Sequence, residues 1–241
     1  MDSTKKQARI AVVLYTLVAI TAPIGLVYVP NKLIVTGDAK ATADRIRASG
    51  SLLHAAIASE LFHQTVEVFL ILVLYGLFKA VSKPLARQMA VLGLIPIPIV
   101  FLNVLNEIAA QILTSGAGFL AVFDQPRLDA LALFFLRLHG QGLQVAAIFW
   151  GLWLFPLGLL IFRCGFIPKI FGVSAIIAGF GYVLQSLMDL ILPEHASGIQ
   201  GLATILELGE PPIILWLLIW GARTPTPSTS CVGRTLNSLQ T

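Results

Sequence analysis

The stretch L-L-H-A-A-I-A-S-E-L-F-H-Q-T-V-E-V-F-L-I-L-V-L-Y-G-L-F, residues Leu52 to Phe78, decides the fold class. It contains no lysine or arginine and is longer than the roughly 20 apolar residues that carry a helix across the ~30 Å hydrocarbon core of a bilayer. Four of its polar side chains, two acids, a histidine and a glutamine, follow a spacing of i, i+3, i+4 and i+7, which places them on one helix face. The stretch therefore predicts a membrane-spanning helix with one polar stripe, made of Glu60, His63, Gln64 and Glu67.

The rest of the chain repeats this pattern. Hydrophobic residues make up 57% of the sequence and charged residues only 12%, too few polar groups to cover a soluble domain. The first apolar run exceeds the length of a signal-peptide core and no small-residue cleavage site follows it, so we count it as a retained span. We expect an all-α polytopic membrane bundle of six transmembrane helices, the other five at Ile10–Val29, Leu85–Leu113, Leu138–Phe162, Ile170–Leu192 and Leu202–Trp220.

Basic residues in the connections set the expected orientation. Ten lysines and arginines fall on one side of these spans and six on the other, and the richer side is the cytoplasmic one by the positive-inside rule. Both termini are then cytoplasmic. We expect residues 1–223 to form the transmembrane domain and residues 224–241, rich in Thr, Ser and Pro, to be a disordered cytoplasmic tail.

Two connections predict structure of their own. The segment Ala41–Arg47 reads as a short surface helix. Asp124 can cap a helix with Pro126 in its first turn, so the fourth helix would run to Phe162. At 1.5 Å per residue that helix is longer than ~50 Å, so it either projects from the bilayer or breaks near Gly140-Gln141-Gly142.

Polar residues inside the other spans gather toward the outer side. Counted from the nearest cytoplasmic charge, they lie ~18 to ~30 Å up the helices, which leaves the inner half apolar. Carboxylates facing lipid would be costly, so they are expected to line an outward-facing acidic pocket in which a bound cation or protons balance the charge. The predicted pocket consists of Glu60, His63, Gln64, Glu67, Asn103, Glu107, Gln144, Gln185, Asp189, Glu207 and Glu210.

Two kinds of cofactor site are compatible with these residues. The E-x-x-H spacing is typical of carboxylate–histidine metal sites in helix bundles and would use Glu60, His63 and Glu67. A bis-histidine haem would need His54 and His139 at the outer rim. Signatures of a nucleophilic serine or cysteine and of a phosphate-binding loop are missing from the sequence, and no motif names a cofactor. The two cysteines, Cys164 and Cys231, are expected to be free thiols.

Several segments resemble a family of bacterial six-helix inner-membrane proteins, the domain of unknown function DUF4386. The longest are I-F-R-C-G-F-I-P-K-I-F-G-V at Ile161–Val173 and A-G-F-G-Y-V-L at Ala178–Leu184. Shorter ones are L-H-G-Q-G at Leu138–Gly142, G-D-A-K-A-T-A at Gly37–Ala43 and G-E-P-P-I-I-L-W-L-L-I-W-G at Gly209–Gly221. The resemblance implies a bacterial inner membrane but no activity or catalytic residues. Pro211-Pro212 departs from the helix-forming residues expected there.

Three functions are compatible with this sequence. The leading hypothesis is binding or transport of a small solute or cation through the acidic pocket. The second is an intramembrane metal-dependent enzyme, and the third is a structural or assembly protein whose polar groups only join helices. The expected partners are the lipid bilayer and that solute or cation. The basic balance, net charge +4, is explained by membrane topology, so no nucleic-acid partner is expected.

Overall fold

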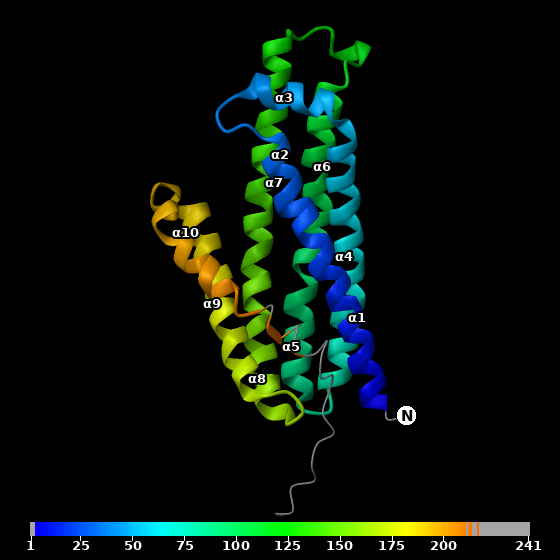
Figure 1. Cartoon of the computed structure of the whole chain (residues 1–241), viewed down its shortest axis with the longest axis vertical. Helices are drawn as coiled ribbons and strands as arrows, with labels where there is room; N and C mark the ends of the chain where they lie inside the picture. The colour runs from blue at the N-terminus through cyan, green and yellow to red at the C-terminus, as the bar shows by residue number, and fades with distance from the viewer. Residues whose placement is uncertain (1–2, 211, 214–215, 217–241) are drawn as a thin grey trace, which may run out of the picture.

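The computed structural model describes residues 3–210, 212–213 and 216. Within these residues the chain is all-α and contains no strand, as the sequence predicts. The helices form an elongated bundle (Figure 1). The predicted tail 224–241 and Cys231 lie outside the described residues.

Five segments of the described chain are long and apolar enough to cross a membrane. The first joins three helical pieces, α1 (Ser3–Pro23), the π-helical turn η1 (Ile24–Tyr28) and α2 (Val29–Leu33). The third and fourth each join two pieces, α5 with α6 and α7 with α8. The remaining bounds are α3 (Ala39–Ala48), α4 (Gly50–Phe78), α5 (Lys83–Leu94), α6 (Pro96–Thr114), η2 (Gly118–Leu120), α7 (Gln125–Leu152), α8 (Leu154–Cys164), α9 (Lys169–Ile191) and α10 (Pro193–Glu207).

The connections sort to two ends of the bundle. The start of α1, the α4–α5 connection and the α8–α9 connection lie at one end, which we call the N-terminal end (Figure 1). Helix α3 and the α6–α7 connection lie at the other, the α3 end. The predicted topology places these same two sets of connections on opposite sides of the membrane.

The α3 end is built from capped helices. Asp38 caps α3 by accepting a 2.8 Å hydrogen bond from the backbone N–H of Ala41, and Asp124 caps α7 by accepting one of 3.1 Å from that of Arg127. Both the short surface helix and the start of the fourth helix are therefore confirmed. Arg47 then joins α3 to α7 through a 2.9 Å ion pair with Asp129.

The fourth helix does not break where glycines suggested a break. Helix α7 continues through Gly140 and Gly142, and the interruption falls at Trp153, three residues before Pro156. Proline removes a helix hydrogen bond and clashes with the preceding turn, which explains the position of the break. Gly142 has another role, because a Cβ there would overlap the side-chain amide of Asn103 on α6.

The sixth span differs from its prediction in the part that is described. Helix α10 begins at Pro193, well before Leu202, and ends at Glu207, while the next three residues form a turn ahead of the two prolines. The segment Leu202–Trp220 is therefore not one continuous helix in its described part. Most of the residues that follow lie outside the described range.

The half of the bundle toward the N-terminal end is packed with apolar side chains, as predicted. Leu70, Phe78, Met89, Leu154 and Ile161 are among its fully buried residues. Polar buried groups concentrate in the other half.

Two reciprocal glycine contacts bring the fourth and fifth spans close together. A Cβ at Gly151 would lie 2.6 Å from the carbonyl oxygen of Gly179, and one at Gly179 would lie 2.8 Å from that of Gly151. Gly158 and Gly172 repeat this relation one heptad away, at 2.7 and 2.8 Å. Small residues let membrane helices approach backbone to backbone, so this interface depends on glycine.

Candidate functional site

Helix α4 carries the polar stripe into the interior of the bundle. Its four residues are exposed by only 2–7%: Glu60, His63, Gln64 and Glu67. Because the whole stripe is buried, neither of its two carboxylates faces lipid, which explains why the apolar span α4 tolerates them.

The outer part of the stripe meets two other helices. Glu60 Oε2 lies 3.1 Å from Nε2 of His139 on α7, and Glu107 of α6 completes a buried group of three. One donor atom from each residue lies within 4.8 Å of the other two. We call Glu60, Glu107 and His139 the carboxylate–histidine triad.

Two oxygens of the triad are buried without a hydrogen-bond partner among the described residues, Glu60 Oε1 and Glu107 Oε2. Leaving a buried polar atom unpaired costs about 1–3 kcal/mol, more for a charged group. No lysine or arginine of the described chain forms an ion pair with either carboxylate. The triad therefore has unused acceptor capacity, and His139 is its one basic partner among the described residues.

Neighbouring polar groups fix the α6–α7 side of the triad. Asn103 donates a 2.8 Å hydrogen bond from Nδ2 to the backbone oxygen of His139, and its own Oδ1 accepts one of 2.9 Å from Asn106. Gly142 is what allows Asn103 to lie this close to α7. The L-H-G-Q-G segment thus supplies both His139 of the triad and Gly142, which leaves space for the Asn103 side chain.

The π-helical turn of the first span packs against the opposite side of Glu60. Pro23 precedes the turn, and a Cβ at Gly25 would lie 2.9 Å from Cγ of Glu60 and 3.3 Å from the backbone oxygen of Ala56. Short π-helical turns occur frequently at functional sites. Here the turn supplies the glycine surface that holds the Glu60 side chain toward α7.

A small cavity reaches the triad from the α3 end. Its volume is about 110 Å³, and Glu107 and His139 form its polar wall. Apolar side chains of η1, α2, α4 and α7 form the rest, among them Leu26, Leu33, Leu53 and Leu136. The cavity can hold water or a small ion beside the triad.

The inner part of the stripe meets a different set of residues. His63 Nε2 lies 3.6 Å from Glu67 Oε2 on the same helix. Across from them, the half-buried Glu210 accepts hydrogen bonds from Tyr15 of α1 at 2.6 Å and from Tyr182 of α9 at 3.3 Å. Both His63 and Glu67 are close enough to Glu210 to interact with it electrostatically.

The other predicted pocket residues lie around these two groups. Gln185 donates a 2.8 Å hydrogen bond to Asp189 within α9, and Asp189 faces Glu207, which ends α10. Gln144 of α7 is half-buried. The structure thus distributes the predicted residues over the triad, the His63–Glu67–Glu210 group and the α9–α10 contact, rather than around one open pocket.

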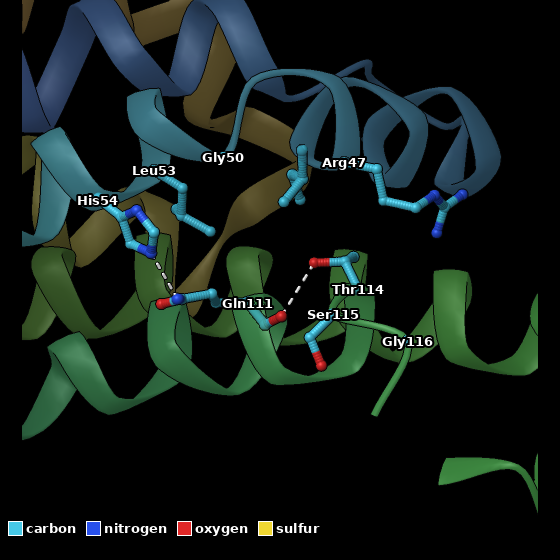
Figure 2. Close-up of a pocket in the computed structure, with 9 residues that line it drawn as sticks. Arg47, Gly50, Leu53, His54, Gln111, Thr114, Ser115 and Gly116 are labelled. Carbon is cyan, nitrogen blue, oxygen red and sulfur yellow. Dashed lines mark hydrogen bonds between the residues drawn. The ribbon is translucent and has the colours of Figure 1, made fainter. Parts of the chain in front are cut away.

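A larger cavity lies at the α3 end and is lined by neither carboxylate of the triad. It measures about 460 Å³ and lies between the N-terminal part of α4 and the end of α6 (Figure 2). His54 Nε2 lies 2.6 Å from Gln111 Nε2 at one side, while Arg47 extends away from this pair. His54 and His139 thus have different partners, Gln111 and Glu60, which does not favour a bis-histidine haem.

Sequence reasoning placed His139 at the outer rim, as a possible haem ligand, and left it out of the predicted pocket. The structure places it opposite Glu60 with an exposed fraction of 4%. The available signal was its position in a glycine-flanked segment, because glycine permits the close helix approach that a buried site needs. The predicted metal trio of Glu60, His63 and Glu67 stays a prediction, while the geometry groups Glu60 with Glu107 and His139.

The triad offers two carboxylate oxygens and one imidazole nitrogen, a donor set that suits divalent cations such as Mn²⁺, Fe²⁺ and Zn²⁺. Metal–ligand bonds of about 2.0–2.2 Å bring donor atoms to about 3.5 Å from one another, so small side-chain rotations would close the triad around an ion. Two ionised carboxylates would balance the charge of a divalent cation.

Comparison with known proteins identifies the family of the chain but no activity. No curated protein and no solved structure matches the chain. The family model described as a domain of unknown function (DUF4386) matches residues 10–221, which include all five candidate spans except the first few residues of the first. The chain is therefore a multi-pass membrane protein that belongs to the DUF4386 family.

Proposed function

We propose that this protein binds a divalent transition-metal cation within the membrane, at Glu60, Glu107 and His139, as part of cation uptake or transfer from the outer side. The observation that carries the proposal is the pair of buried oxygens without a partner, Glu60 Oε1 and Glu107 Oε2, on a triad whose third member is an imidazole. Buried carboxylates without a basic partner are stable only if a cation or protons neutralise them.

The surroundings of the triad support a site that exchanges its ion. The cavity of about 110 Å³ leads toward the α3 end, which the positive-inside rule makes the outer side. In the opposite direction, beyond the His63–Glu67–Glu210 group, the bundle is packed with apolar side chains to the N-terminal end. A cation would therefore arrive from outside, in a bacterial inner membrane as the family resemblance implies.

The test is metal binding by purified protein. We expect protein reconstituted in lipid nanodiscs, stripped with a chelator and titrated with Mn²⁺ or Zn²⁺, to bind one ion with an affinity that Glu107→Gln lowers at least 10-fold. Asp189→Asn is the matched control, because this acid lies in another span and bonds Gln185. Equal binding by wild type and Glu107→Gln would overturn the proposal.

Transport is tested separately. Proteoliposomes containing a metal-sensitive dye should show uptake of the ion that binds, and Glu60→Gln should abolish it. Binding without uptake would restrict the function to a bound metal.

A metal-dependent enzyme is the second candidate, and one observation favours it. The triad supplies three ligands and borders a cavity, and catalytic metal sites use three protein ligands and keep an open position for water or substrate. Metal binding without ion flux, together with a metal-dependent turnover that Glu107→Gln removes, would favour the enzyme over the transporter.

A further inference from the structure

The His63–Glu67–Glu210 group is a second buried cluster with unused hydrogen-bonding capacity. His63 and Glu67 are each 7% exposed, and neither His63 Nδ1 nor Glu67 Oε2 has a hydrogen-bond partner among the described residues. Between them Gln64, 2% exposed, has an unpartnered Oε1. Three consecutive polar positions of one helix face are therefore buried and incompletely paired.

Three other helices bring titratable groups to the cluster. Tyr15 comes from α1 and Tyr182 from α9, and both donate to Glu210. Glu207, at the end of α10, adds a further carboxylate close to Glu210. No lysine or arginine within residues 3–210 forms an ion pair with Glu67 or Glu210.

The two carboxylates of the cluster differ in their hydrogen-bond donors. Glu210 accepts hydrogen bonds from two phenolic hydroxyls. Oε2 of Glu67 has no donor at hydrogen-bond distance among the described residues, and it lies 3.6 Å from the imidazole Nε2 of His63. Two buried carboxylates and one imidazole cannot all be unprotonated at low cost, so the cluster must hold at least one proton.

We propose that His63, Glu67 and Glu210 form an intramembrane proton-binding site, in which an exchangeable proton binds Glu67 Oε2 beside the His63 imidazole. The proton comes from water and returns to it, so one O–H bond forms as another breaks and nothing is oxidised or reduced. The site lies two helix turns from Glu60 along α4 and does not depend on whether the carboxylate–histidine triad binds a metal.

Infrared difference spectroscopy tests the site directly. Protein in nanodiscs without added metal is brought from alkaline to acidic buffer, and the carboxylic-acid C=O band that develops is compared in H₂O and D₂O. We expect one deuterium-sensitive band of the wild type to be lost in Glu67→Gln and kept in Glu194→Gln, whose side chain is 62% exposed at the start of α10. A spectrum unchanged by Glu67→Gln would overturn the proposal.

A second variant tests the cluster without replacing its carboxylates. Tyr15→Phe removes the 2.6 Å hydrogen bond to Glu210 but keeps the ring that packs in the core. We expect this variant to retain the Glu67 band and to change the pH at which it develops. An unchanged pH would remove Glu210 from the site. Because no metal is added, failure here is distinct from failure of the metal-binding test.

Discussion

Glu60 and His139 are 79 residues apart in the sequence, yet Oε2 of the first lies 3.1 Å from Nε2 of the second inside the bundle. The contact joins the second and fourth spans at the level where Glu107 enters from the third. Three spans thus meet through three side chains that can each donate an electron pair. This convergence, and not the acidic composition alone, is what distinguishes a cation site from a polar helix contact.

His139→Gln is expected to weaken metal binding at least about 10-fold, since replacing even groups that only orient metal ligands costs 10–100-fold. Glutamine keeps a polar side chain of similar reach, so the loss would come from the imidazole donor. Isothermal titration calorimetry with Mn²⁺ or Zn²⁺ in nanodiscs provides the measurement. His54→Gln is the control, because His54 bonds Gln111 at the α3 end, and an equal loss in both variants would point to general disruption.

Gly25→Ala is expected to damage the triad without destabilising the fold. A Cβ at this position would come within 2.9 Å of Glu60 Cγ and must displace that side chain, whereas alanine is favoured over glycine in helices by about 1 kcal/mol. We therefore expect reduced metal affinity at an unchanged or higher melting temperature. Gly140→Ala, where nothing lies within 4 Å of the added Cβ, should bind metal as the wild type does.

A lower melting temperature for Gly25→Ala together with unchanged affinity would contradict this reading. The π-helical turn would then serve the packing of the first span and not the position of Glu60.

Local sequence patterns predicted the elements of the fold because membrane spans are encoded by long apolar runs. The polar stripe of α4 was equally readable, since a period of 3.6 residues places Glu60, His63 and Glu67 on one face, and all three are buried. The cap at Asp124 followed from residue type and from Pro126 in the first turn. Each of these features depends on neighbours within one helix turn.

The residues that contact the α4 stripe from other helices could not be predicted from local sequence patterns. Tyr15 and Glu210 are 195 residues apart, and their hydrogen bond depends on how the first helix packs against the segment after α10. His139 was left at the rim because residue spacing within one helix does not show which neighbour a side chain meets, and the structure places it against Glu60 of α4. The single expected pocket became two clusters because its residues came from helices whose relative rotation no periodicity specifies.

Gly151→Ala is expected to destabilise the protein by about 1–3 kcal/mol, the usual cost of inserting a methyl group into a packed interior. The added Cβ would lie 2.6 Å from a backbone oxygen of α9, and backbone cannot rotate away as a side chain can. Thermal unfolding in detergent, followed by circular dichroism, measures the effect. Gly201→Ala of α10 has open space around the added Cβ and should unfold like the wild type.

If Gly151→Ala had the same melting temperature as Gly201→Ala, the backbones of the fourth and fifth spans would not be in contact in the detergent-solubilised protein. The position of α9, and with it that of Tyr182, would then have to be set by other contacts.

The ion-pair network of α3 predicts that this end of the protein loosens in acid. Hydrogen bonds from Lys40 and then Arg47 hold the pKa of the Asp44 carboxyl below its usual range. A carboxyl whose pKa is lowered on folding stabilises the folded helix at every pH above its unfolded-state pKa of about 3.9, and this stabilisation is lost as the pH falls through the folded pKa. The protection of the α3 amides from hydrogen exchange, measured relative to the intrinsic exchange rate at each pH, should therefore fall below about pH 4. Asp44→Asn should show lower protection than the wild type at neutral pH and respond less to acid. Asp38→Asn is the matched control, because asparagine also caps helices and the pairs of Asp44 remain intact. The same acid response in wild type and Asp44→Asn would show that another carboxylate of this end, such as Asp129 beside Arg47, controls the transition.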